Sequence, residues 1–171
     1  MEKEIVFQLQ HHRWTAGDPL FMLLTDYVSV VTFFIMAIML WRIYRKKDQP
    51  RNIYFLLTAL LVSAGLTHLL KWAVHRPRPY TVSEGIDAMV NSGGYAFPSG
   101  HSAEVFVLVF GLWMLYKNKY LRLIILLWAL FIAYTRMAFG VHYPTDIVGG
   151  IITAAFSVWI ARRIFPVKKR G

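Results

Sequence analysis

Two histidines and three basic residues occur at spacings that would suit chemistry on a phosphate group. They stand in three short segments, KWAVHRPRP at 71–79, PSGH at 98–101 and TRMAFGVHYPTD at 135–146. A phosphate ester needs cations and N–H donors around its oxygens, a nucleophile in line with the leaving group, and a proton for the departing oxygen. Lys71, Arg78 and Arg136 supply three positive charges, and the two arginines can form forked bonds to phosphate oxygens.

The histidines and their neighbours have complementary expected roles. His142 precedes Asp146 by four residues, so the carboxylate can accept a proton from one imidazole nitrogen and orient the other as a nucleophile. His101 is then left as the general acid. Ser99 is a favoured N-cap and Gly100 lets a ligand approach the backbone, which predicts a phosphate cradle at a helix start. These groups supply the charge that a metal supplies elsewhere, so we expect neither metal nor cofactor.

The composition indicates that a membrane, rather than water, surrounds the elements that carry these residues. Hydrophobic residues make up 57% of the 171 residues and charged residues 16%, against roughly 25% charged in soluble domains. The net charge of +10 is distributed between apolar runs and not in patches, which favours a lipid bilayer over nucleic acid as partner. The chain has no cysteine, and this excludes disulfides and thiol catalysis.

Five segments are close in length and apolar content to the roughly 20 mostly apolar residues that a membrane span needs. They are residues 20–42, 52–71, 99–116, 120–138 and 145–165. We therefore predict an all-α, integral-membrane helical bundle of about five transmembrane helices over residues 20–171, with the catalytic motifs within 71–146. The sequence leaves the oligomeric state open.

Residues 1–19 precede the first predicted span and lack the features of a cleavable signal peptide. Ile5, Val6 and Leu9 would share one face of a helix, with Trp14 at the level of the headgroups. We predict an interfacial segment or a tail here.

The basic residues orient the predicted bundle. With five spans, one side carries 13 of the 19 basic residues, namely Arg42, Arg45, Lys46, Lys47, Arg51, Lys117, Lys119, Arg122, Arg162, Arg163, Lys168, Lys169 and Arg170. The positive-inside rule places this side and the C-terminus in the cytoplasm, and the N-terminus and all three motifs outside. Four of the six remaining basic residues gather beside His101 and His142, where an anion site would require them.

The three motifs resemble the signature of the type 2 phosphatidic acid phosphatase superfamily, which is Lys-x6-Arg-Pro, Pro-Ser-Gly-His and Ser-Arg-x5-His-x3-Asp. All three parts occur in order, with Thr135 in place of the signature serine and five predicted spans where membrane members commonly have six. The resemblance implies a lipid phosphatase that forms a covalent phosphohistidine on His142. Bacterial members imply undecaprenyl pyrophosphate, phosphatidylglycerophosphate or lipid A 1-phosphate as substrate, in the cytoplasmic (inner) membrane with the active site facing the periplasm.

Several polar residues near the motifs have less defined roles. Glu104, His68 and Thr135 are candidates for supporting the site, and the role of Asp26 is open. Arg76 forms a second Arg-Pro pair and is expected to contact a lipid headgroup or solvent. Two alternative functions also remain: a lipid-to-lipid phosphotransferase with the same site, and a non-catalytic lipid transporter.

Overall fold

The protein is a bundle of helices in the computed structural model, which describes residues 1–45 and 50–167. In chain order the helices are α1 (Glu2–His11), the 3₁₀ helix η1 (Thr15–Gly17), α2 (Asp18–Asp26), α3 (Val28–Arg45), α4 (Pro50–Val74), α5 (Pro79–Val82), α6 (Gly100–Leu115), α7 (Lys119–Ala138) and α8 (Pro144–Ile164). The all-α architecture is thus confirmed. Part of the predicted cytoplasmic basic group lies outside the described residues: Lys46, Lys47, Lys168, Lys169 and Arg170.

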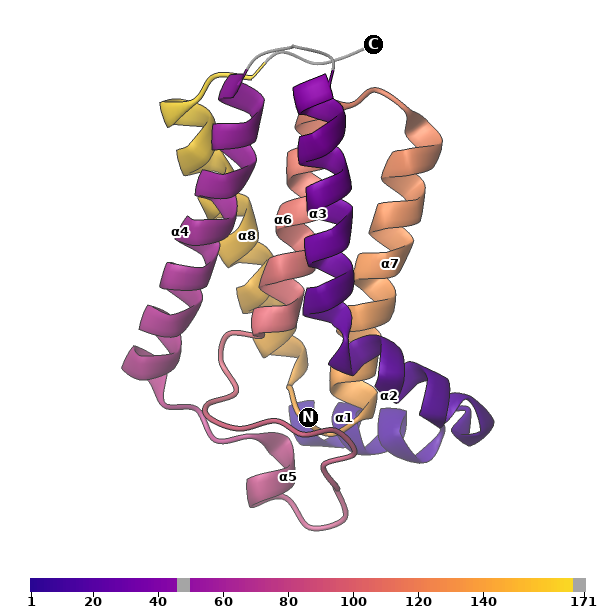
Figure 1. Ribbon diagram of the computed structural model, residues 1–171. Coiled ribbons are helices and arrows are strands. Elements are labelled where there is room, and N and C mark those ends of the chain that lie inside the picture. The colour runs from indigo at the N-terminus through magenta and orange to yellow at the C-terminus, as the bar shows by residue number, and fades with distance from the viewer. Residues whose placement is uncertain (46–49, 168–171) are drawn as a thin grey trace.

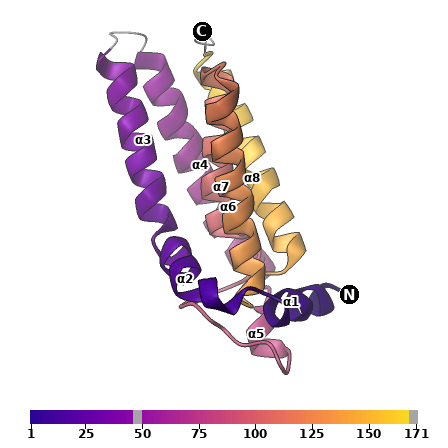
Figure 2. The same cartoon turned by 90° about the vertical axis from the view of Figure 1, so that its right-hand side faces the viewer.

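Helix α6 occupies the centre of the bundle. It packs against α4, α7 and α8, and α3 covers its remaining side (Figures 1 and 2). Val107, Leu108 and Leu112 have no exposed surface. A helix that is apolar on nearly every face must be enclosed by other helices or by lipid, and the packing of α6 shows that the other helices enclose it here.

The predicted span 20–42 is not one helix, because the chain bends by 56° between α2 and α3. Helix α2 packs against α7: Thr25 shares a hydrogen bond of 3.0 Å with Thr135, and the Phe21 ring lies edge-on against Phe131. Helix α3 instead runs along α6. The two halves therefore pack against different helices, and the bend at Tyr27 makes this possible.

Within residues 1–45 and 50–167, three helical ranges are long and apolar enough to cross a bilayer, and the bent pair α2–α3 makes a fourth if it is counted as one span. They are Arg51–Val82, Lys119–Ala138 and Pro144–Ile164, the first of which includes α5. Helix α6, with 16 residues, is shorter, at about 24 Å by the α-helical rise. The count by length and composition is thus three to four, against the five predicted. Exposed Leu61, Trp72, Ile124 and Ile152 cover the outer faces, as in an integral membrane protein.

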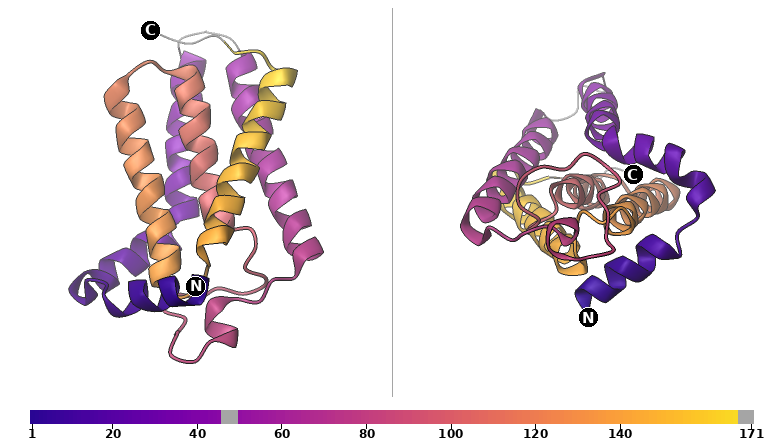
Figure 3. Two further views of the ribbon diagram at one scale, coloured as in Figure 1. Left: turned by 180° about the vertical axis from the view of Figure 1, so that it is seen from behind. Right: turned by 90° about the horizontal axis from the view of Figure 1, so that it is seen from below.

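The two ends of the bundle differ. One end carries α1, α2, α5 and the loop 83–99, while α3 and α8 both end at the opposite end (Figure 1). Helix α6 begins farther inside the bundle than the adjacent ends of α4 and α7 (Figures 1 and 3). The loop that leads into α6 therefore runs into the bundle at this end, where all three motifs lie.

Candidate active site

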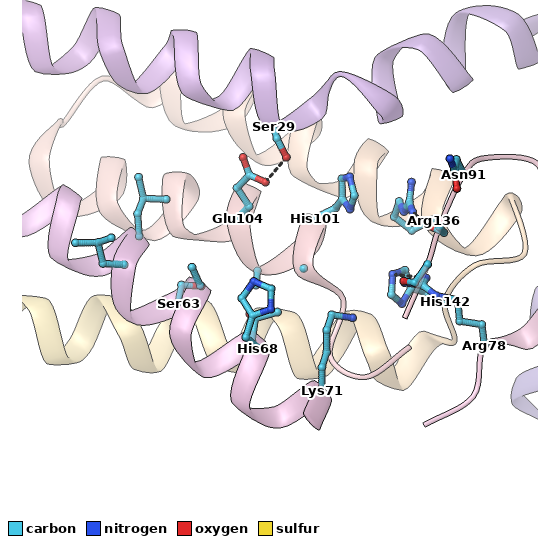
Figure 4. Close-up of a pocket in the computed structure, with 18 residues that line it drawn as sticks. Ser29, Ser63, His68, Lys71, Arg78, Asn91, His101, Glu104, Arg136 and His142 are labelled. Carbon is cyan, nitrogen blue, oxygen red and sulfur yellow. Dashed lines mark hydrogen bonds between the residues drawn. The ribbon is translucent and has the colours of Figure 1, made fainter. Parts of the chain in front are cut away.

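The three motifs meet around one cavity of about 580 Å³. Lys71 and Arg78 reach it from the end of α4 and the turn that follows, and His101 from the first turn of α6. Arg136 reaches it from the last turn of α7, and His142 from the loop between α7 and α8. Figure 4 shows His101 close to Arg136 and His142, with Lys71 and Arg78 beside them. The expected convergence of two imidazoles and three cations is present.

The contacts of His142 define its tautomer. The Nη1 group of Arg78 lies 3.3 Å from Nε2 of His142. A guanidinium only donates hydrogen bonds, so Nε2 must accept and the imidazole proton must be on Nδ1. That nitrogen faces Oδ2 of Asp146 at 3.5 Å, which is long for a hydrogen bond and leaves Nδ1 without a partner of good geometry. Such contacts commonly shorten when the catalytic complex forms.

The environment of His142 keeps the imidazole neutral. Burial lowers its pKa to about 4; Asp146 opposes this shift, and Arg78 and Arg136 add to it. At neutral pH the Nε2 lone pair is therefore unprotonated. A neutral imidazole with its proton held on Nδ1 has the form that a nucleophile requires.

Asp146 is fully buried and has a partner on each carboxylate oxygen. Oδ2 accepts from the backbone N–H of Tyr143 at 2.8 Å, which closes the first turn of α8. Oδ1 accepts from Nη1 of Arg76 at 2.7 Å. Pro144 at the start of α8 suits a first helical turn. The carboxylate is therefore fixed in position beside His142.

Arg78 and Arg136 differ in how much of each guanidinium the protein itself occupies. Arg78 donates to the backbone carbonyls of Gly93, Gly94 and Val141 at 2.8–3.0 Å. Arg136 donates from Nη2 to Ser92 Oγ at 2.6 Å, and its buried Nε has no partner among the described residues. Because a buried donor is costly to leave unpaired, Arg136 is the guanidinium best prepared for an anion.

This difference predicts separate consequences for the two arginines. Arg136→Gln should lower kcat/KM for phosphate release by roughly 10²–10³-fold, as the loss of one oxyanion donor typically does. Arg78→Gln should also lower the melting temperature, because it removes three hydrogen bonds to backbone carbonyls, one of them the buried carbonyl of Val141. Thermal melts and steady-state kinetics of both variants would test these two predictions. Equal melting temperatures for the two variants would contradict the structural role of Arg78.

The start of α6 is joined directly to α8. The backbone N–H of Ser99 donates to the carbonyl of Asp146 at 2.9 Å. Helix α8 approaches so closely that a Cβ added to Gly150 would lie 2.6 Å from the Ser99 carbonyl oxygen. The hydroxyl of Ser99 accepts from Ser102 and caps α6, so it faces the helix and does not line the cavity. Gly100 does line the cavity, and the backbone there stays a candidate phosphate cradle.

The supporting candidates fall into two groups. Glu104 and His68 line the cavity, and Glu104 accepts from Ser29 of α3 at 2.8 Å, as Figure 4 shows. Thr135 of α7 is fully buried and bonded to Thr25 of α2, and it is not among the residues that line the cavity. Asp26 is exposed at the end of α2.

Arg76 has a role that the sequence prediction missed. Its Nη1 donates to Asp146 and to Thr145 Oγ1 at 2.5 Å, its Nη2 donates to Glu2 at 2.6 Å, and its guanidinium stacks on Tyr143 at 4.2 Å. The sequence prediction named only headgroup or solvent as its contacts and missed these partners, although 24% of the side chain remains exposed. The Lys-x6-Arg-Pro spacing selected Arg78 over Arg76 as the phosphate ligand, and nothing in the sequence indicated a partner for Arg76.

The sequence profile of the PAP2 superfamily matches residues 52–170 and so includes all three motifs. The chain belongs to this superfamily. The predicted family is thus confirmed. Among solved structures, Aquifex aeolicus LpxE resembles this PAP2 protein with a TM-score of 0.80 and 25% identity, over 94% of this chain and 93% of that one. A PAP2-type phosphatidylglycerolphosphate phosphatase from Bacillus subtilis shares the fold, with a TM-score of 0.77 and 19% identity, over 95% and 83%.

Two curated relatives are similar in sequence. A lipid A 4'-phosphatase of Bacteroides thetaiotaomicron is 43% identical over 68 residues, which are 40% of this chain and 30% of that protein. The undecaprenyl-diphosphatase BcrC of Bacillus subtilis is 23% identical over 148 residues, which are 85% of this chain and 73% of that protein. The match to the first relative thus spans less than two thirds of its length.

Proposed function

We propose that this PAP2 protein is a metal-independent lipid phosphatase that hydrolyses phosphate or pyrophosphate monoesters of membrane lipids. The observation that carries the proposal is the shared cavity, where His101 and His142 stand among Lys71, Arg78 and Arg136. The names of the relatives, which are lipid A and undecaprenyl-diphosphate phosphatases, support the same reaction class.

The proposed reaction has two steps. First, Nε2 of His142 attacks phosphorus, the bond to the lipid oxygen breaks, and His101 donates a proton to that oxygen. Second, His101 takes a proton from water, the water oxygen attacks phosphorus, and the bond to Nε2 breaks to release phosphate. Asp146 holds the Nδ1 proton throughout and stabilises the charge that the imidazole gains. Lys71, Arg78 and Arg136 stabilise the phosphoryl oxygens.

The shape of the cavity supports a lipid substrate. From the phosphate end it extends between α3, α4 and α6, where Leu60, Leu61 and Ala64 line it. An acyl or prenyl tail would lie along these residues while the headgroup meets the motifs. The substrates that we propose are therefore of the undecaprenyl pyrophosphate, phosphatidylglycerophosphate or lipid A 1-phosphate class.

We place the protein in the bacterial inner membrane with the active site facing the periplasm. Support comes from the distribution of charge, since Lys117, Lys119, Arg162 and Arg163 all lie at or beyond helix ends opposite the cavity. This orientation puts the N-terminus outside and the C-terminus in the cytoplasm.

A phosphate-release panel on detergent-solubilised protein tests the function. We expect release from at least one lipid of the three proposed classes, inhibition by orthovanadate, which mimics the five-coordinate phosphorus, and no loss in EDTA. Radiolabelled donor lipid would show whether phosphate goes to water or to an acceptor lipid. Absence of release from every lipid, or activity that EDTA removes and vanadate leaves intact, would contradict the proposal.

A further inference from the structure

A chain of hydrogen bonds connects the first helix of the protein to the proposed nucleophile, and it includes a residue that the reaction above does not use. We infer that Glu2 of α1 is a positioning residue that acts on His142 through Arg76 and Asp146. The inference rests on the proposed phosphatase function and extends its machinery to the N-terminal helix.

Glu2 has strong partners on both carboxylate oxygens. Oε2 accepts from Nη2 of Arg76 at 2.6 Å. Oε1 accepts from the backbone N–H of Thr145 at 3.1 Å and from its hydroxyl at 2.5 Å. Burial raises the pKa of Glu2, but the hydrogen bonds from Thr145 and Arg76 outweigh this effect and lower its pKa overall. Glu2 is therefore an anion attached to the first turn of α8, directly beside Asp146.

Helix α1 is itself held against the site end of the bundle, so Glu2 is not a loose terminal residue. Gln10 donates to the carbonyl of Asp87 at 2.8 Å and accepts from its N–H at 3.0 Å. Val6 is fully buried in a cluster with Ile86 and Tyr143. Figures 1 and 2 show α1 lying across the site end of the bundle, where it contacts α7 and α8. The apolar face of α1 thus packs at least partly on protein.

The charges along this chain have a direct consequence for His142. Arg76 stands between two carboxylates, Glu2 at 2.6 Å and Asp146 at 2.7 Å, so the three groups carry one net negative charge. Without Glu2, Arg76 would neutralise Asp146 alone. The carboxylate would then stabilise less well the positive charge that the imidazole of His142 gains during phosphoryl transfer. Glu2 is therefore expected to affect turnover more than substrate binding.

Glu2→Gln tests the inference, with Glu4→Gln as the matched control. Glu4 lies on the same helix and accepts from Gln8 at 2.9 Å, with no bond to Arg76. We expect Glu2→Gln to lower kcat by about tenfold, the lower limit typical of partners that orient a functional side chain, and to leave KM and the melting temperature unchanged. Glu4→Gln should match the wild-type protein.

A double-mutant cycle tests the route. In an Arg76→Gln background, Glu2→Gln should cause no further loss of kcat, because the connection is already broken. Losses of kcat that add in the double variant would overturn the inference. A Glu2→Gln protein with normal kcat would also overturn it, as would one in which only KM or the melting temperature changes. If the wild-type protein releases phosphate and the Glu2→Gln and Glu4→Gln variants have the same kcat, the inference fails and the phosphatase function stands. If the wild-type protein releases none, both fail.

Discussion

Replacing His142 by alanine is expected to lower the rate of lipid phosphate release by about 10⁴-fold or more, the scale seen when a nucleophile–base unit is broken. The substitution removes Nε2, which is the atom proposed to form the bond to phosphorus. It also leaves Asp146 buried without the imidazole that it faces at 3.5 Å. Initial rates of phosphate release, measured with the lipid that is most active in the panel, would give the loss directly.

The matched control for this variant is His12→Ala. His12 is an exposed imidazole at the end of α1, and its Nδ1 lies 3.0 Å from the carbonyl of Gln8. We expect this variant to retain the wild-type rate. Melting temperatures would show that both variants are folded. A His142→Ala protein that keeps its fold and more than about a tenth of the activity would exclude a nucleophilic role.

His101→Ala is expected to show the second-largest loss, about 10²–10⁴-fold for a lipid phosphate monoester, which is typical of a missing general acid. The lost function is protonation of the leaving oxygen. A leaving group that is already acidic needs little protonation, so p-nitrophenyl phosphate should be hydrolysed at a rate much closer to that of the wild-type protein. His142→Ala should lose activity on both substrates, because both need the nucleophile.

His68→Ala is the matched control for His101, because His68 lines the same cavity from α4. Its loss should be small and similar for the two substrates. Equal losses for lipid phosphate and p-nitrophenyl phosphate in His101→Ala would contradict the role of His101 as general acid, and would leave it as a residue that shapes the cavity.

Local signals in the sequence predicted most of the helix ends well. Pro144 and the cap at Ser99 mark the starts of α8 and α6 within one residue of the predicted spans. The bend at Tyr27 was not predictable in this way, because it depends on which partner each half of the segment meets. Thr25 contacts α7, while α3 packs along α6, and hydrophobicity alone does not distinguish these neighbours.

The features of the site likewise divide into those that the sequence predicted and those that it did not. Motif spacing singled out the residues that line the phosphate end of the cavity, because residue type and order limit which groups can bind and attack a phosphate. It gave no information on contacts between distant segments. The pairing of Arg76 with Glu2, 74 positions away, depends on α1 crossing the end of the bundle. The hydroxyl of Ser99 caps α6, as its residue type predicted, while Gly100 and His101 of the same motif line the cavity.

The most direct test is to locate the covalent intermediate. The protein would be mixed with lipid substrate carrying ³²P in the terminal phosphate, denatured at alkaline pH, where phosphohistidine survives, and digested for peptide mapping. We predict label on His142 in the wild-type protein. The His142→Ala variant, which keeps Asp146 and every other residue of the site, should carry no label. Label on any other residue, or wild-type turnover with no labelled peptide, would contradict nucleophilic attack by His142.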